Sequence, residues 1–160
     1  MYEVASHLAT ESKKRQKKAE KDLFARSSFN RFYYATFLAV RNEISPLDEK
    51  WENLGHASYP KLIGNTMQAE FKKNIKAARK LGDTRKVSAF SSAATAAKNL
   101  SSIMNSANAC RIQADYFPEN KVQFLDSDFQ LGPSKLSAAK QWPSNAKILA
   151  KTVAEAWRIV

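Results

Sequence analysis

Few side chains in this 160-residue sequence are suited to catalysis, and their small number limits the chemistry. There are two histidines, His7 and His56, and one cysteine, Cys110. These residues cannot supply a recognised zinc cluster, so we expect no metal and no other cofactor. His56 lies in a polar stretch, where it could transfer protons near neutral pH, although a solvated histidine is the simpler interpretation. Cys110 lies among alanines and is expected in the core.

The glycines and the single cysteine exclude further classes of protein. The four glycines are spread over the whole chain, so neither GxGxxG nor GxxxxGK[ST] can be written with them. So few glycines also argue against a sandwich or barrel built on tight turns. One cysteine excludes an intramolecular disulfide and fits a reducing compartment. With no secretory signal and no apolar run long enough for a membrane span, we expect a cytoplasmic protein that does not enter membranes.

The excess of basic residues points to a phosphate-bearing partner. Lys and Arg number 26 and Asp and Glu 15, which gives a formal charge of +11. This exceeds the roughly 2–8 charges that solubility requires, and nucleic acid explains it economically. The densest basic residues form two clusters on predicted helices: Lys13, Lys14, Arg15, Lys17 and Lys18; and Lys72, Lys73 and Lys76, with Arg79, Lys80, Arg85 and Lys86. Solvated helix faces are the alternative, and neither cluster has interleaved aromatics for reading a single strand.

Hydrophobic spacing predicts one helical domain over residues 1–160. Apolar side chains recur at three- and four-residue steps in five stretches: roughly 3–22, 26–44, 60–81, 84–114 and 133–160. Pro46 ends the second stretch, and Pro143 kinks or splits the last. Residues 115–132 are expected to be irregular or briefly extended. The predicted fold class is therefore all-α, an antiparallel bundle of about five helices.

Two sets of polar side chains on these helices could form a site. On the second helix, the spacing places Asn30, Tyr34 and Arg41 on one polar side. An interhelical hydrogen-bond network is the alternative use of this side. On the fourth helix, Arg111 and Asp115 are four residues apart, the spacing of an ordinary intrahelical ion pair.

These sets lie in segments that resemble signatures of the HEPN superfamily. The segment NRFYYATFLAVR, which begins at Asn30, resembles a helix of small bacterial members that reads approximately Ser-Arg-Ala-Tyr-Tyr-Ala-x-Phe-His-Ala-Ala-Arg. Ala114-Asp115-Tyr116, with Arg111 upstream, resembles the later Arg-x-Arg-Ala-Asp-Tyr. Gly55-His56-Ala57 is a weaker match to a His-Ser-Gly that precedes a helix. The resemblance spans roughly residues 5 to 158. The positions that agree in the first segment are Arg31, Tyr33, Tyr34, Ala35, Phe37, Ala39 and Arg41.

The resemblance implies a HEPN-like bundle that forms a homodimer. Active ribonucleases of the superfamily carry an arginine followed four to six residues later by histidine at a dimer-facing cleft. The arginine grips the scissile phosphate and the histidine moves a proton. In this sequence Tyr116 follows Arg111 at that offset, and tyrosine is a poor base at neutral pH. Leu38 stands where the family has a helix histidine, and Gln113 replaces the second arginine of the later motif.

Carried over by position, the family's roles predict a site in this sequence. The predicted catalytic residues are Arg111, which would stabilise the phosphate, and Tyr116 or His56, which would handle protons. The residues predicted to bind substrate are Asn30, Arg31, Tyr34 and Asp115.

Two functions remain open at this point. The missing histidine favours a non-catalytic module of a prokaryotic toxin–antitoxin or phage-defence system. Such a module would bind RNA or other nucleic acid, or an antitoxin, nucleotidyltransferase or effector partner. The alternative is a metal-independent endoribonuclease toxin that uses Arg111.

Overall fold

The computed structural model describes residues 1–160 and is mostly helical, which confirms the all-α prediction. The residues fall into two compact units, Met1–Leu38 with Asn105–Ser144, and Ala39–Met104 with Asn145–Val160. The boundaries between units fall within α2 (Lys18–Ile44), α5 (Thr84–Tyr116) and α6 (Leu136–Trp157), so these helices contribute to both. None of the helices combines the length and the apolar composition that crossing a membrane requires.

The first unit is built on α1 (Tyr2–Lys14) and on parts of α2, α5 and α6. Its core contains Phe29 and Phe32 of α2, both fully buried. Phe32 meets the ring of Tyr2 edge to face at 5.6 Å, and Phe29 meets Phe129 in the same way and at the same distance. Because buried aromatic rings remove much apolar surface from water, these contacts hold the helices of this unit together.

A small antiparallel sheet lies between α5 and α6 in the sequence, within the first unit. Its strands follow the order β1 (Gln123–Phe124), β2 (Phe129–Leu131) and β3 (Ser134–Lys135). Phe129 pairs with Phe124 and Leu131 with Ser134. Phe129 and Leu131 are both buried because alternate residues of a strand share one face. Gly132, at φ 55°, makes the turn into β3, a left-handed conformation that favours glycine.

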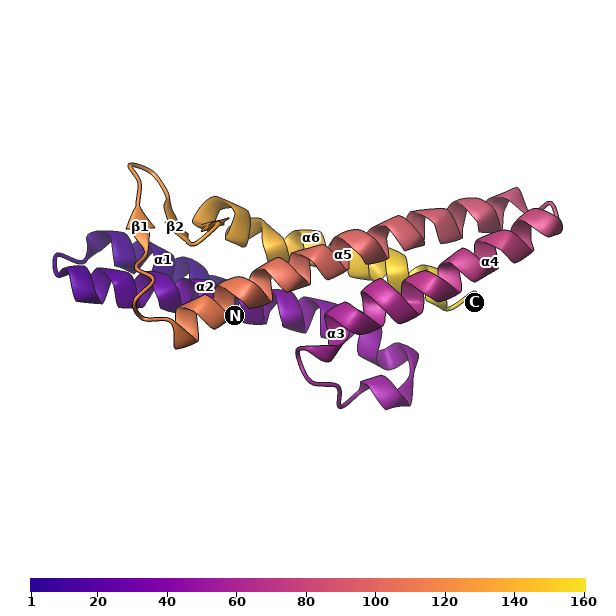
Figure 1. Cartoon of the computed structure of the whole chain (residues 1–160), viewed down its shortest axis with the longest axis horizontal. Helices are drawn as coiled ribbons and strands as arrows, with labels where there is room; N and C mark the ends of the chain where they lie inside the picture. Colours follow the sequence, from indigo (N-terminus) through magenta and orange to yellow (C-terminus); the bar gives the residue numbers. More distant parts are fainter. The chain divides into compact units, whose positions relative to one another are not determined.

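The second unit contains a series of short helices followed by a helical hairpin. The helices before α5 are η1 (Ser45–Leu47), η2 (Glu49–Trp51), α3 (Ser58–Lys61), η3 (Leu62–Met67, a π-helical segment) and α4 (Gln68–Lys80). Figure 1 shows α4 running back along the first turns of α5. The rings of Phe71 and Phe90 stack between these two helices at 6.2 Å, and Trp157 lies against Phe71 at 5.8 Å.

The turn of this hairpin follows from two adjacent residues. Gly82 has φ 68°, so it ends α4 in a conformation that other residues rarely adopt. The carboxylate of Asp83 accepts the N–H of Lys86 at 3.0 Å, which satisfies one of the free donors at the start of α5. The end predicted for the helical stretch 60–81 is thus confirmed.

The first predicted helix boundary is wrong. The sequence predicts helices at 3–22 and 26–44, but α1 ends at Lys14 and α2 already begins at Lys18. Arg15 is extended, with φ −70° and ψ 138°. The break falls inside the densest run of lysines, where a continuous helix would hold like charges three and four residues apart. At the other end of the chain, α6 runs through Pro143 without a break.

Candidate functional site

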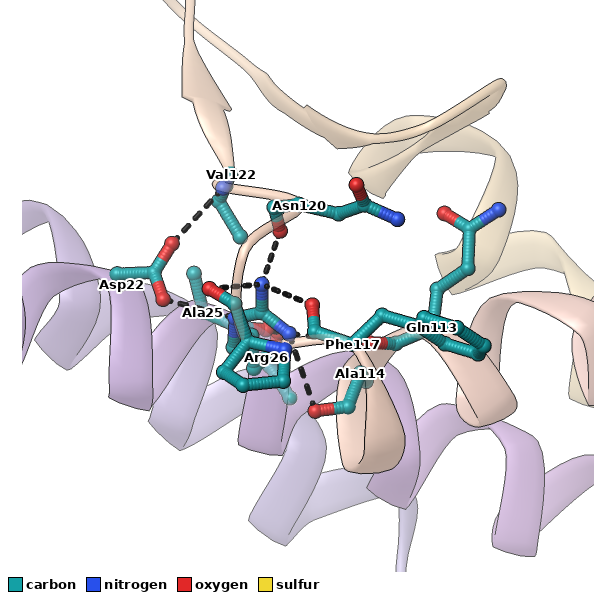
Figure 2. Close-up of polar contacts among 10 residues, drawn as sticks. Asp22, Ala25, Arg26, Gln113, Ala114, Phe117, Asn120 and Val122 are labelled. Atoms are coloured by element: carbon teal, nitrogen blue, oxygen red, sulfur yellow. Dashed lines mark hydrogen bonds and ion pairs between the residues drawn. The ribbon is translucent and has the colours of Figure 1, made fainter.

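One buried arginine fastens the end of α5 to α2 within the first unit (Figure 2). The side chain of Arg26 is only 8% exposed, and its Nε donates to Asp22 at 2.7 Å. The other carboxylate oxygen of Asp22 accepts the N–H of Val122 at 2.8 Å. The Arg26 guanidinium also donates to five backbone carbonyls, those of Gln113 (3.0 Å), Ala114 (3.2 Å), Phe117 (3.1 Å), Pro118 (3.4 Å) and Asn120.

These carbonyls explain why an arginine is needed at this position. The last carbonyls of a helix have no partner within the helix and carry partial negative charge. A guanidinium presents five N–H groups in a fixed plane, so it can satisfy several of them together with the loop that follows. Arg26 therefore fixes the end of α5, whose last two turns carry Arg111 and Asp115.

The predicted residues Asn30, Arg111 and Asp115 meet beside this anchor. Arg111 Nε lies 2.8 Å from Asp115 Oδ2, and Asn30 Nδ2 donates to Asp115 Oδ1 at 2.6 Å. The Arg111 Nε–H has no aligned hydrogen-bond acceptor, so its contact with Asp115 is an ion pair rather than a hydrogen bond. The side chains of Arg111 and Asp115 are 23% and 27% exposed. Both interpretations of the sequence, the intrahelical ion pair and the interhelical network, describe this arrangement.

Three further predicted residues surround the pair. Tyr34 accepts a hydrogen bond from Arg111, and the Arg111 guanidinium lies 5.4 Å from the ring of Tyr116. The guanidinium of Arg31 lies 5.9 Å from the ring of Tyr34. Tyr116 is 64% exposed. We refer to Asn30, Arg31, Tyr34, Arg111, Asp115 and Tyr116 as the Arg111 cluster.

The surroundings shift the pKa of Arg111 and that of the neighbouring Tyr33. Desolvation alone would lower the pKa of Arg111, but the neighbouring Asp115, Tyr116 and Tyr34 outweigh it and raise that pKa. Burial raises the pKa of Tyr33, whereas the charge of Arg111 opposes this increase. Both pKa values move further from neutral pH, so neither Arg111 nor Tyr33 becomes a general base. A phosphate bound here would compete with Asp115 for Arg111.

A small pocket adjoins the Arg111 cluster. Its volume is about 290 Å³, near the lower limit of roughly 300 Å³ for ligand pockets in general. Its lining residues come from the anchor, the cluster and their small or apolar neighbours: Leu23, Arg26, Ser27, Asn30, Arg31, Ala114 and Asp115. Arg26 is committed to backbone carbonyls, which leaves Arg31 as the exposed cation of this pocket.

The first basic cluster surrounds the turn between α1 and α2. Three of its cations contact carboxylates: Lys14 and Arg15 with Glu11 at 2.9 and 3.1 Å, and Lys17 with Glu20 at 3.5 Å. Lys13 donates to the carbonyl of Ser127 at 2.6 Å, and Lys18 is exposed without an ion pair. The guanidinium of Arg15 also lies 4.4 Å from the centre of the Phe24 ring.

The second basic cluster surrounds the turn between α4 and α5, in the second unit. All seven of its cations are exposed: Lys72, Lys73, Lys76, Arg79, Lys80, Arg85 and Lys86. Only Lys73 forms an ion pair, with Glu70 at 3.0 Å. The one other carboxylate of this turn, Asp83, is occupied by its hydrogen bond to the backbone of Lys86. We call this set the hairpin cluster.

His56 belongs to the second unit, where it lies half-buried in the turn before α3. The Arg111 cluster belongs to the first unit. Proton transfer by His56 at that cluster therefore stays a prediction. Cys110 is buried as expected, and burial raises the pKa of its thiol to about 11, against a hydrogen bond from Ser134. No three His, Cys, Asp or Glu side chains lie close enough together to hold a metal ion.

The sequence does not point to Arg26, which lies at the start of the second predicted helical stretch and organises the site. Its spacing from Asp22 resembles that of any i, i+4 pair on a helix surface, so only the burial of Arg26 distinguishes this pair.

Comparison of the chain with protein-family models, with curated proteins and with solved structures found no match.

Proposed function

We propose that this protein binds RNA or another nucleic acid, without cleaving it, chiefly through the hairpin cluster. The observation that supports this proposal is the set of seven exposed cations at the α4–α5 turn, of which one has a carboxylate partner. Lysine and arginine side chains without carboxylate partners are free to neutralise phosphates, and the release of condensed counterions then drives binding.

The resemblance to the HEPN superfamily supports the biological part of the proposal. It suggests a homodimer that works in a prokaryotic toxin–antitoxin or defence system, with an antitoxin, nucleotidyltransferase or effector as its protein partner. The paired state of Arg111 favours binding over cleavage, because Asp115 already neutralises the guanidinium that would grip a scissile phosphate.

The test replaces three cations of the hairpin cluster and measures affinity for RNA. We expect the triple variant Lys72→Gln/Lys76→Gln/Lys80→Gln to bind a fluorescent 20-nucleotide RNA at least 10-fold more weakly in anisotropy titrations at low salt. The matched control, Lys50→Gln/Lys98→Gln/Lys147→Gln, removes the same charge from exposed positions away from the turn. Equal losses in both variants would mean that net charge, rather than this surface, governs binding.

A metal-independent endoribonuclease is the second candidate, and the observation that favours it is the pocket beside the Arg111 cluster. Asn30, Arg31 and Asp115 line the pocket of about 290 Å³. Asp115 pairs with Arg111, which contacts Tyr34 and Tyr116. In EDTA, such an enzyme would cleave RNA with the wild-type sequence and lose activity on Arg111→Gln. If His56 moves the proton, His56→Ala abolishes cleavage and Tyr116→Phe does not. No cleavage by a folded wild-type protein would exclude this candidate.

A further inference from the structure

A second and larger pocket lies in the first unit, and none of the residues of the Arg111 cluster lines it. Its volume is about 530 Å³, well within the general range of roughly 300–1,000 Å³ for small-molecule sites. Three lysines line it, Lys18 and Lys21 from α2 and Lys121 from the loop before β1. Val122 and the half-buried ring of Phe124 provide its apolar surface.

The positive charge of this pocket has no internal counter-charge. Asp22 is the only acidic residue in the lining, and its two oxygens are taken by Arg26 at 2.7 Å and by the N–H of Val122 at 2.8 Å. None of the three lysines forms an ion pair. The site therefore attracts an anion, and the hydrogen bonds of Asp22 fix the wall that bears Lys121 and Val122.

The ring of Phe124 sits among these lysines although it is far from two of them in sequence. The ammonium of Lys21 lies 4.4 Å from the centre of the ring, and Phe129 contacts the same ring at 5.2 Å. The sequence shows no aromatic residue interleaved with the first basic cluster, but the fold brings Phe124 of β1 into the same pocket as Lys18 of that cluster. Phe129 is buried, so it holds Phe124 in place.

We propose that this pocket binds one unstacked nucleotide of single-stranded nucleic acid, with the base stacked on Phe124. Lys18, Lys21 and Lys121 then contact the flanking phosphates. A base gains more from stacking on an aromatic ring than an exposed ammonium gains from lying over it. The flexible stem of Lys21 lets its ammonium move from the ring to a phosphate. This inference rests on the proposed nucleic-acid binding and assigns it a second contact, separate from the hairpin cluster.

The ring and the charges are tested separately on three probes: a 12-nucleotide oligouridine, an abasic oligomer with the same number of phosphates, and an RNA duplex. We expect Phe124→Leu to weaken oligouridine binding roughly 5- to 100-fold, while binding of the abasic oligomer and of the duplex stays unchanged. The matched control is Phe24→Leu, which also removes a half-buried ring of this unit beneath a cation, here Arg15. We expect Phe24→Leu to change the affinity for each of the three probes by less than about two-fold. Thermal unfolding verifies that both variants are folded.

Removing the lysines gives the complementary result. Lys18→Gln/Lys21→Gln/Lys121→Gln weakens both single-stranded probes and reduces the steepness of their salt dependence, in contrast to Phe124→Leu.

The outcomes separate this inference from the proposed function. If Phe124→Leu binds oligouridine as tightly as the wild type does, the pocket is not the binding site, and the proposed function is unaffected. If Phe124→Leu weakens binding of the abasic oligomer as much as binding of oligouridine, the base does not stack on Phe124. If an acidic peptide binds in a Phe124-dependent way and oligouridine does not, the site belongs to a protein partner and the inference is wrong. No binding of any nucleic acid overturns both proposals.

Discussion

Arg26 illustrates how one side chain can determine where others lie. Its six hydrogen-bond acceptors belong to α2, to the last turn of α5 and to the loop before the sheet. The Arg111 cluster includes residues of the end of α5, and the pocket at Phe124 includes Lys121 and Val122 of this loop. Both depend on Arg26, directly or through Asp22.

Replacing Arg26 should destabilise the protein far more than replacing an exposed arginine on the same helix. Arg26→Met leaves Asp22 and the carbonyls at the end of α5 without their partner, so we expect a loss of roughly 3–5 kcal/mol in the free energy of unfolding. The control Arg31→Met, at an exposed site, should cost less than about 0.5 kcal/mol. Urea denaturation measures both, and similar losses would show that the anchor is unimportant.

The buried thiol of Cys110 should make the folded protein less stable in alkaline solution. Its pKa is raised to about 11 by burial, from an ordinary 9.0, so above pH 9 the unfolded chain loses the thiol proton before the folded chain does. The free energy of unfolding therefore falls as pH rises from about 9 to 11, by roughly 2–3 kcal/mol from this group.

The variant Cys110→Ala isolates this contribution, because every other titrating group remains. Urea denaturation at pH 8, 9 and 10.5, under reducing conditions, should show a steeper loss for the wild type than for the variant. Parallel pH profiles would contradict the assignment.

Among the elements, η3 depends on a close approach to α5 in the second unit. A Cβ on Gly64 would lie 2.6 Å from Ser101 Oγ and 2.9 Å from Ser101 Cβ. Ser101 cannot turn away without losing its hydrogen bond to the carbonyl of Pro60 at 2.9 Å. Gly64→Ala, which would ordinarily strengthen a helix, should therefore destabilise this protein by roughly 1–3 kcal/mol in urea denaturation.

Two variants distinguish this clash from a general effect on glycine. At Gly55 an added Cβ meets nothing within 4 Å, so Gly55→Ala should be tolerated. The double variant Gly64→Ala/Ser101→Gly removes the obstructing side chain and should recover part of the loss. A stable Gly64→Ala protein would contradict the packing described for η3.

The elements also show what periodicity can and cannot predict. The buried aromatic face of α2 and the helix end at Gly82 were predictable, because apolar spacing and glycine act locally. The turn at Arg15 was not, because a stripe as thin as that of α1 does not locate where the chain reverses. The three strands after α5 are too short to show an alternating pattern.

The same distinction holds for the candidate site. The i, i+4 spacing predicts the Arg111–Asp115 pair, whose partners share a helix. It does not predict that Asn30 joins Asp115 or that Phe124 lies under Lys21, since these contacts link distant parts of the chain. The sequence also does not predict that Arg26 is buried, because its backbone acceptors lie in a distant part of the chain.

Considering the whole molecule, the excess charge is not shared equally between the two units. The first has 12 basic and 8 acidic side chains, a net charge of +4, and the second has 14 and 7, a net charge of +7. The second unit carries the hairpin cluster, and the first carries the pocket at Phe124. If both contact nucleic acid, several phosphates are neutralised at once and affinity must depend strongly on salt.

The salt dependence of RNA affinity is the most direct test of nucleic-acid binding. With about five phosphates neutralised on a single strand, the dissociation constant should rise roughly 100-fold between 50 and 200 mM NaCl. The hairpin variant Lys72→Gln/Lys76→Gln/Lys80→Gln should show a shallower dependence, and the control Lys50→Gln/Lys98→Gln/Lys147→Gln the wild-type one. A dissociation constant that does not change with salt, or no measurable binding at 50 mM, would contradict the central claim.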